Sequence, residues 1–289
     1  MGRELAQALP PARRVFEEAD DVLGAPLSRL MWEGPEEELT LTRAAQPAIL
    51  VHSMAAHAVL RERLGPVALA AGHSLGEFSA HVAAGTLSFP DALRAVRLRG
   101  ELMFEAGVRR PGTMAAVLGL SDDAVREVCA AVTEGICVPA NFNSDGQVVI
   151  SGDRAGVEAG MGRAREAGAK RAVELNVSGA FHSPLMQPAQ EGLAAHLAVI
   201  AFADPAFPVL SNVTAAPVRT GAEARMLLFR QLTAPVLWSA SIAAMRAAGA
   251  DRFLELGPGN VLCGLNKRNA LGASCASVGS PADVERWTS

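Results

Sequence analysis

Residues 70–85 of this chain read AAGHSLGEFSAHVAAG, in which Ser74 stands midway between Gly72 and Gly76. The apolar run PVALAA before this pattern predicts a short buried strand, and the residues from Ser74 to Gly85 predict a helix. A serine between a strand and a helix sits on a sharp turn with a strained backbone, where side chains two positions away would collide. Glycine on both sides of the serine is therefore the pattern of a nucleophile elbow, a feature of α/β folds.

The predicted elbow would place the Ser74 hydroxyl at the carboxyl end of the strand, above the first turn of the helix. At that turn the N–H of Leu75 and the positive end of the helix dipole would face a developing oxyanion. The alternative is a plain glycine-rich turn with an idle serine, because a bare G-x-S-x-G pattern occurs often by chance. The strand before the pattern and the helix after it favour the nucleophile.

A serine nucleophile needs a base, and position in the chain favours His182 among the six histidines. His182 lies in NVSGAFHSPLMQPA, a loop that leaves a predicted strand, and loops at strand ends carry catalytic groups. His73 adjoins the serine, but neighbouring side chains diverge on a sharp turn, so we expect it to line the site instead. The other four histidines lie within predicted helices: His52, His57, His81 and His196. No histidine follows His196, so the chain order of an ordinary α/β-hydrolase triad does not apply.

Arg99 lies on the apolar face of a helix predicted over residues 90–103. At 100° per residue, its neighbours within about 60° are all apolar: Ala92, Ala95, Val96, Leu102 and Met103. A guanidinium that points into the interior needs a partner. The sequence leaves two partners open, which are an internal Asp or Glu and a carboxylate on the substrate held by the bidentate fork.

Residues 112–178 differ from the sequence on either side in the order of their predicted strands and helices. Their predicted order is strand, helix, two strands joined by a turn at 143–146, helix and strand. This β-α-β-β-α-β order is the ferredoxin-like arrangement. The flanking residues, 1–111 and 179–289, alternate helices and strands and predict a parallel α/β body into which the small α+β subdomain is inserted.

Composition excludes several classes of partner. The chain has 289 residues, a formal net charge of −4 and no run rich in Lys and Arg, which argues against nucleic acid. No apolar stretch approaches the roughly 18–20 residues that span a membrane, and no secretory signal opens the chain. The cysteines lack paired metal-binding spacing, so we interpret them as reduced thiols of a cytoplasmic protein without a metal site: Cys129, Cys137, Cys263 and Cys275.

Seven blocks, in the same order along nearly the whole chain, resemble the malonyl-CoA:acyl-carrier-protein transacylases and the related acyltransferase domains of polyketide synthases. The blocks are GHSLGEFSA, RG.LM, GTMAAVLGL, NFNSDGQVVISG, GAFHSPLM, RQLTAPVLW and ELGPGNVLCGLNKR. The resemblance implies a hydrolase-like body with a parallel sheet and an inserted ferredoxin-like subdomain. It also implies transfer of a malonyl group from malonyl-CoA to the phosphopantetheine thiol of acyl carrier protein, without a metal or redox cofactor.

The resemblance assigns roles to individual residues. It makes Ser74 the acylated nucleophile, His182 the base and Arg99 the clamp on the malonyl carboxylate. It makes Gln231 the residue whose backbone carbonyl orients the histidine in place of a triad acid. Phe181 resembles the malonyl-preferring form of the family, as opposed to the form that accepts methylmalonyl. An acetyl donor would leave the buried cation unpaired, which predicts selectivity for malonyl.

The resemblance has one departure, at the beginning of the chain. The family opens with an apolar strand and a GQGSQ-like loop that carries its second oxyanion donor, whereas this chain opens at the MGREL-like segment that follows the loop. We therefore expect Leu75 alone to supply an oxyanion N–H, and residues 67–71 to lack a neighbouring strand. A late-placed start with the strand encoded upstream of Met1, a trimmed chain and an impaired copy would each account for the difference.

Two rival functions stay open from the sequence. A thioester hydrolase that clears stalled acyl groups would share the nucleophile but would need no carboxylate clamp, so Arg99 speaks against it. A non-catalytic subunit that binds carrier protein would follow from an impaired site. The acceptor carrier belongs to either fatty acid or polyketide synthesis.

Overall fold

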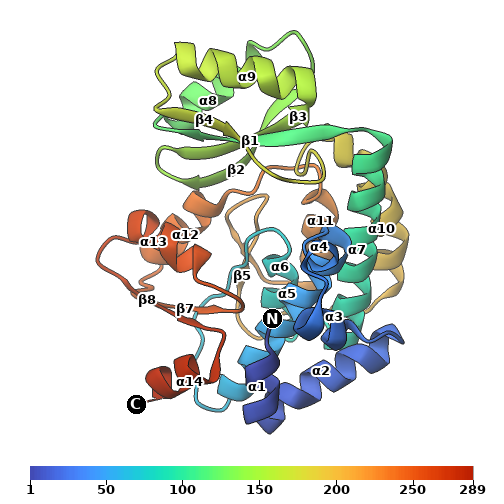
Figure 1. Ribbon diagram of the computed structural model, residues 1–289. Helices are drawn as coiled ribbons and strands as arrows, with labels where there is room; N and C mark the ends of the chain where they lie inside the picture. The colour runs from blue at the N-terminus through green and yellow to red at the C-terminus, as the bar shows by residue number, and fades with distance from the viewer. Residues whose placement is uncertain (289) are drawn as a thin grey trace.

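A computed structural model describes residues 1–288 (Figure 1). The molecule has an upper part, which holds a four-stranded sheet with two helices over it, and a larger lower part built mainly of helices. Both termini lie in the lower part. The chain is therefore mixed α/β, as the sequence predicts.

The N-terminal helices form one side of the lower part. They are α1 (Arg3–Ala8), α2 (Pro10–Leu23), α3 (Leu27–Glu33), α4 (Glu36–Leu39) and α5 (Thr42–Leu60). Helix α2 ends at Gly24, which adopts a left-handed conformation, and Pro47 lies inside α5. Helix α5 is buried on most of its faces, which explains its near-continuous apolar sequence.

Two helices follow in the same core, α6 (Gly76–Ala83) and α7 (Phe89–Arg109). The hydroxyl of Ser88 caps α7 by accepting a hydrogen bond from the N–H of Asp91. Helices α5 and α7 pack so closely that a Cβ on Gly100 would lie 2.9 Å from the carbonyl oxygen of Thr42. This close approach fixes the position of Arg99, the residue before Gly100, against α5.

The upper part contains β1 (Gly112–Leu118), α8 (Asp122–Ala130), β2 (Cys137–Ser144), β3 (Gln147–Asp153), α9 (Arg154–Glu166) and β4 (Arg171–Glu174). We call its four strands the upper sheet; their order is β2-β3-β1-β4 and every neighbouring pair is antiparallel. One face of the sheet packs under α8 and α9 around Phe142, Val148 and Ile150, and forms a core of its own. The other face contacts the lower part through Met114 and Val149.

The strands of the lower part are short and do not form one continuous sheet within residues 1–288. Strand β5 (Val209–Leu210) pairs antiparallel with β6 (Pro217–Val218), and β7 (Arg252–Leu256) pairs parallel with β8 (Ser274–Val278). The prediction of a buried strand before Ser74 is wrong for most of that segment. Ala70 alone makes a bridge, to Val209, and Val67 is 37% exposed. A strand needs a ladder along its edges, and here a single residue finds a partner.

The remaining helices complete the lower part. They are the 3₁₀ turn η1 (Pro184–Met186) and the α-helices α10 (Gln187–Val199), α11 (Gly221–Arg230), α12 (Trp238–Ala247), α13 (Val261–Asn269) and α14 (Pro281–Thr288). Helix α13 is followed by β8 and α14, which end the described part of the chain. Among the described residues, no helix is both long and apolar enough to cross a membrane.

The cysteines are of two kinds, which corrects the expectation of four reduced thiols. Cys263 and Cys275 form a disulfide, because α13 packs on β8 and brings their Cα atoms to 5.5 Å. Cys129 and Cys137 are free, as expected, and both are buried in the upper part. Sequence spacing could not show the pairing, which depends on how a helix and the following strand pack.

Candidate active site

Ser74 occupies the sharp turn that its glycine neighbours predict. Its φ is 50°, in the left-handed region that non-glycine residues rarely adopt. A Cβ on Gly72 would lie 1.9 Å from the carbonyl carbon and oxygen of Gly76, so position 72 admits only glycine. A Cβ on Gly76 itself would meet nothing within 4 Å, which corrects the expectation that both glycines avoid a collision.

The turn is held by the side chain of Asn212, which follows β5. The N–H of Ser74 donates to Asn212 Oδ1 at 2.7 Å, and Asn212 Nδ2 donates to the carbonyl of Gly72 at 2.7 Å. Asn212 is fully buried, so these bonds form without competition from water. Asn212 was not among the residues that the sequence singled out, because a polar residue in the largely apolar stretch FPVLSNV gives no sign of this role.

His182 contacts the serine, as predicted. Its Nε2 lies 2.8 Å from Ser74 Oγ, while Nδ1 lies 3.0 Å from the carbonyl oxygen of Gln231 and 3.1 Å from that of Ala234. The two carbonyls accept the Nδ1 proton, which leaves Nε2 free to accept the serine hydroxyl. Burial, and next the positive charge of Arg99, lower the pKa of His182 to about 3, so the ring is neutral at physiological pH.

Arg99 reaches the same serine from α7, where it is buried. Its Nη2 donates to Ser74 Oγ at 3.0 Å and to Gln231 Oε1 at 2.9 Å, and its Nη1 donates to Gln46 Oε1. Within residues 1–288 no carboxylate forms an ion pair with Arg99, so its direct partners are neutral. Burial lowers the pKa of Arg99 to about 10, opposed by the charge of Glu77, and the side chain remains a cation. A buried cation without a contacting anion is costly, so an anionic group would be favoured next to Arg99.

The start of α6 offers an oxyanion donor. In the described part of the chain the N–H of Leu75 donates no hydrogen bond, while the next three amides close the first turn by donating to the carbonyls of residues 73–75. A free N–H beside the nucleophile at a helix N-terminus can stabilise the oxyanion of a tetrahedral intermediate.

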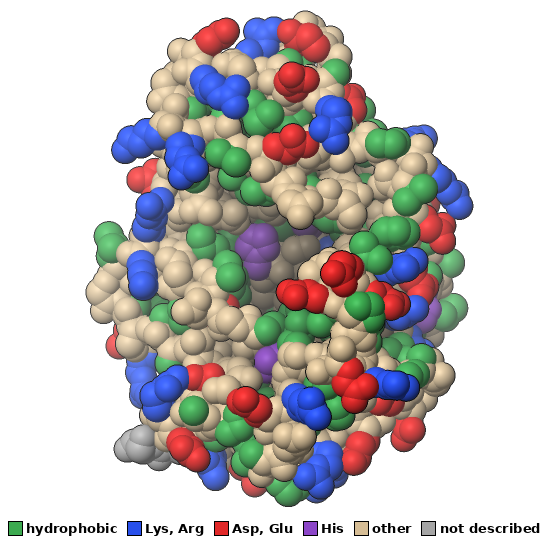
Figure 2. Space-filling model, in the orientation of Figure 1, with side chains coloured by type: hydrophobic (Ala, Val, Ile, Leu, Met, Phe, Trp, Pro, Cys, Tyr) green, Lys and Arg blue, Asp and Glu red, His purple; other side chains and the backbone are tan. Residues whose placement is uncertain are grey.

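His73 and Phe181 line the boundary between the lower part and the upper sheet. His73 Nε2 bonds Asn143 Oδ1 of β2 at 2.8 Å, and its ring packs on Trp238. Phe181 packs both on the main core and on the Met114 side of the upper sheet. Figure 2 shows a hollow between the two parts in which histidine side chains are visible.

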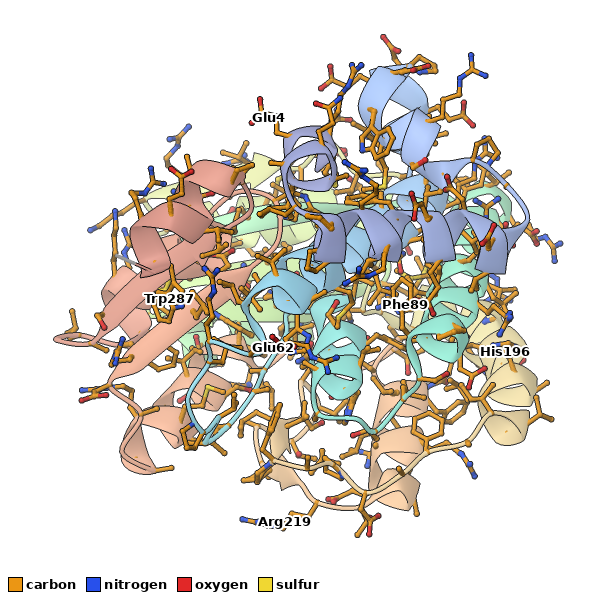
Figure 3. The ribbon with its side chains drawn as sticks, turned by 90° about the horizontal axis from the view of Figure 1, so that it is seen from below. Glu4, Glu62, Phe89, His196, Arg219 and Trp287 are labelled. Carbon is orange, nitrogen blue, oxygen red and sulfur yellow. A yellow bond between two sulfur atoms is a disulfide. The ribbon has the colours of Figure 1, made fainter. Side chains whose placement is uncertain are left out.

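The other histidines lie elsewhere. His52 bonds the carbonyl of Gly279 at 2.8 Å, and His81 is buried on α6 without a partner for either ring nitrogen. Figure 3 shows His196 at the outer edge of α10. No group of three or more His, Cys, Asp or Glu side chains in residues 1–288 could hold a metal ion.

Comparison with known proteins agrees with the chemistry of this site. The profile of the acyl transferase domain family matches residues 1–281. The malonyl CoA-acyl carrier protein transacylase of Bacillus subtilis (strain 168) is 46% identical over 99% of this chain and 90% of that protein. Its counterpart in Escherichia coli (strain K12) is 42% identical over 96% of this chain and 91% of that protein.

Solved structures are similar over the same extent. A malonyl-transacylase in complex with its type II PKS acyl-carrier protein aligns with a TM-score of 0.94 at 43% identity, covering 99% of this chain and 93% of that one. An acyl carrier protein S-malonyltransferase from Vibrio cholerae O1 aligns with a TM-score of 0.96 at 40% identity, covering 99% and 94%.

Proposed function

The chain belongs to the acyl transferase domain family, among the malonyl CoA-acyl carrier protein transacylases, and we propose that it transfers a malonyl group from malonyl-CoA to the phosphopantetheine thiol of an acyl carrier protein. One observation carries the proposal. A buried arginine that contacts no carboxylate of the described residues lies 3.0 Å from the hydroxyl of a serine that is paired with a neutral histidine. In a donor whose carboxylate lies two bonds from its thioester carbonyl, the carboxylate would bind Arg99 while the carbonyl lies next to the Ser74 hydroxyl.

In the first half-reaction, Ser74 Oγ attacks the thioester carbonyl of malonyl-CoA while His182 Nε2 takes the hydroxyl proton. The resulting oxyanion accepts a hydrogen bond from the N–H of Leu75. The C–S bond then breaks, coenzyme A leaves as a thiol with the proton from His182, and malonyl-Ser74 remains. The Gln231 carbonyl holds the imidazole in the tautomer that this exchange needs.

In the second half-reaction, the phosphopantetheine thiol of the carrier protein occupies the place that coenzyme A has left. His182 takes the thiol proton, the sulfur attacks the ester carbonyl of malonyl-Ser74, and Ser74 Oγ leaves with that proton. Each step uses only groups of the protein, the malonyl group and the two thiols between which it is transferred. We therefore infer that no metal or redox cofactor takes part.

Arg99 supplies the selectivity of the proposed reaction. With malonyl bound, the guanidinium would turn from the Ser74 hydroxyl to the free carboxylate and bind it with two parallel hydrogen bonds. Acetyl offers no such partner and would leave the cation buried and unpaired. Phe181, packed beside His182, would limit the room for a branched donor such as methylmalonyl. The clamp also separates this function from a thioester hydrolase, which would not need it.

We also propose that residues 112–178 form a ferredoxin-like subdomain inserted into a hydrolase-like body made of residues 1–111 and 179–289. The support is the β2-β3-β1-β4 order of the upper sheet and the separate core under α8 and α9. The short parallel contacts of the lower part, Ala70 with Val209 and β7 with β8, support a body of parallel character.

Covalent labelling tests the proposed function. Incubation with radiolabelled malonyl-CoA should label the wild type on Ser74, and Ser74→Ala should abolish the label while the protein stays folded. Persistent labelling of Ser74→Ala would remove Ser74 as the nucleophile, and release of free malonate without carrier acylation would favour the hydrolase.

Donor selectivity tests the clamp separately. Arg99→Ala should lower malonyl transfer while acetyl transfer holds or rises, because an uncharged pocket no longer penalises the acetyl group. Equal losses toward both donors, together with a lower melting temperature, would make Arg99 a structural residue.

A further inference from the structure

The guanidinium of Arg99 is held from two sides by glutamine side chains. Gln46 Oε1 of α5 accepts from Nη1, and Gln231 Oε1 accepts from Nη2 at 2.9 Å. Each glutamine can act as an acceptor only while its amide is turned with the oxygen toward Arg99. What fixes the two amides therefore fixes the direction of the cation.

Each amide is fixed by what its nitrogen bonds. Gln46 Nε2 donates to Thr42 Oγ1 at 2.7 Å, one turn back on α5. Gln231 Nε2 donates to Glu77 Oε2 at 2.6 Å and to the carbonyl of Ser74 at 2.9 Å. If the Gln231 amide were flipped, its oxygen would face a carboxylate and a carbonyl, and its nitrogen would face a guanidinium. Every contact would then be repulsive, so this environment allows one orientation.

Glu77 is a fully buried carboxyl on α6 that the proposed reaction does not use. Its Oε2 accepts from Gln231 and, at 3.3 Å, from the N–H of Asn212, the residue that holds the Ser74 turn. Its Oε1 has no hydrogen-bond partner in the part of the chain that the structure describes. A buried carboxyl with one unsatisfied oxygen lowers the stability of the fold. The two residues that Glu77 bonds are Gln231, which contacts Arg99, and Asn212, which holds the Ser74 turn.

We propose that Glu77 is a positioning residue for donor selectivity: through its hydrogen bond to Gln231 Nε2 it turns the Gln231 oxygen toward Arg99 and so aims the clamp at the donor carboxylate. This inference rests on the proposed function and deepens it. Glu77 touches neither the donor nor the reacting atoms.

The hydrogen bond between Glu77 and the Gln231 side chain acts on the clamp and not on the base. The part of Gln231 that orients His182 is its backbone carbonyl, which follows the end of α11, where the N–H of Gln231 bonds the carbonyl of Leu227. Ala234 gives the imidazole a second carbonyl. Turning the Gln231 side chain therefore leaves the base in place, and acetyl transfer, which needs the base but not the clamp, should be nearly unaffected.

Positioning by Glu77 depends on the length of its side chain, which places an acceptor oxygen next to Gln231 Nε2, and not on its charge. Burial raises the pKa of Glu77 to about 7, against the lowering effects of its hydrogen bonds and of Arg99, the charged group that faces it from α7. Ionised or protonated on Oε1, the side chain keeps Oε2 as an acceptor for Gln231. An amide oxygen at the same place would serve equally well.

Two substitutions at position 77 separate reach from charge. Glu77→Gln removes the charge and keeps an acceptor oxygen at the same distance, whereas Glu77→Asp keeps the charge and withdraws the acceptor by one methylene. We expect Glu77→Gln to retain malonyl transfer and its preference over acetyl. We expect Glu77→Asp to lose about tenfold or more in kcat/KM for malonyl-CoA, as for a lost hydrogen bond to a charged network, with acetyl transfer nearly unchanged.

Other results overturn the inference. A loss in Glu77→Gln with activity kept in Glu77→Asp assigns the role to charge or proton transfer. If Glu77→Asp loses transfer activity equally toward malonyl and acetyl donors and has a lower melting temperature, the role of Glu77 is structural. If both variants keep the full preference for malonyl over acetyl, Glu77 has no role in selectivity.

Crystal structures of the two variants test the inference whatever the protein transfers. The contact between Arg99 Nη2 and Gln231 Oε1 should persist in Glu77→Gln and be lost in Glu77→Asp; its persistence in both contradicts the proposal. A wild type that is not labelled by malonyl-CoA would refute the proposed function alone, because the position of the amide is read independently.

Discussion

The upper sheet and the segments around Ser74 are stabilised in different ways. In the upper sheet, β1 and β3 pair along their whole length, from Gly112 opposite Asp153 to Leu118 opposite Gln147. In front of Ser74, Ala70 makes one bridge to Val209 and no ladder. There, side-chain amides replace the ladder: Asn212 bonds the backbone on both sides of the turn, and Gln231 bonds the Ser74 carbonyl.

The two regions also differ in backbone strain, measured by positive φ angles at residues other than glycine. Three described residues other than glycine have a positive φ: Ser74 (50°), His182 (56°) and Ala215 (53°). None lies in the upper sheet, and two of them form the nucleophile and base of the proposed reaction. Such conformations cost of order 1–3 kcal/mol each and persist only where the surroundings impose them. Regular pairing therefore stabilises the upper sheet, while individual buried contacts hold the reactive groups in place.

The largest expected effect is confined to the site. His182→Ala should lower malonyl transfer by about 10² to 10⁴, the range for a lost general base, with little change in folding. His196→Ala, on the outer edge of α10, is the matched control and should keep full activity. If His73→Ala were the crippling change and His182→Ala mild, the assignment of the base would be wrong.

A substitution in the upper sheet should do the opposite. Ile150 is fully buried between the sheet and its helices, so Ile150→Ala should lower the free energy of unfolding by about 2–5 kcal/mol. Transfer per folded molecule should change little, because Ile150 lies in the separate core of the upper sheet, and the hydrogen bonds described for Ser74, His182 and Arg99 go to other residues. Chemical denaturation measures the first quantity and active-site titration with labelled malonyl the second. A large drop in activity per labelled site would show that the two regions are coupled.

Asn212→Ala should lower both transfer activity and stability, each by less than the two substitutions above. It leaves the N–H of Ser74 and the carbonyl of Gly72 buried without partners, which should lower the free energy of unfolding by about 1–3 kcal/mol. Because the lost bonds hold the nucleophile, kcat should fall as well, unlike in Ile150→Ala. Normal turnover in a destabilised Asn212→Ala would mean that the turn is held by its glycine and by α6 alone.

Acid should weaken the lower part. Burial lowers the pKa of His182 to about 3 and of His81 to about 4, from an ordinary value of 6.5, so below that value the unfolded chain binds protons that the folded chain does not. Glu77 acts in the opposite sense, since the folded chain keeps its proton up to about 7 and the unfolded chain releases it above 4.5.

For these three groups the unfolded chain binds one more proton than the folded chain between the ordinary pKa values of Glu and His. These three groups alone should lower the free energy of unfolding by about 1.4 kcal/mol per pH unit as the pH drops through that window. His52, His57 and His73, whose pKa values burial also lowers, should make the fall steeper. Urea denaturation at two pH values one unit apart measures this slope, and His81→Leu should flatten it. A slope that is absent or reversed contradicts the burial of these histidines. Residues 112–174 contain no histidine, so their amides should lose hydrogen-exchange protection only with global unfolding.

Local pattern was enough to find many of the elements and the candidate catalytic residues. The sharp turn at Ser74, the inward face of Arg99 and the loop position of His182 follow from glycine spacing, helical period and strand ends. The order of strands and helices over residues 112–174 follows from periodicity and turn residues. These features depend on neighbours within one or two turns of the chain, which is the range over which such patterns carry information.

Long-range packing decided the rest. The strand predicted before Ser74 did not form a ladder, because a strand depends on the residues beside it in space. The disulfide between Cys263 and Cys275 depends on how α13 packs on β8. The bond from Gln231 to the carbonyl of Ser74 joins residues 157 positions apart.

The sequence by itself therefore determined which groups the proposed reaction uses: a serine on a forced turn, a histidine in a loop and an arginine on an apolar face. The tertiary structure alone decided how these groups are aimed, through Asn212, Gln231 and Glu77. Hydrogen bonds between buried side chains have strict geometry but no sequence period, so they exist only once the chain has folded.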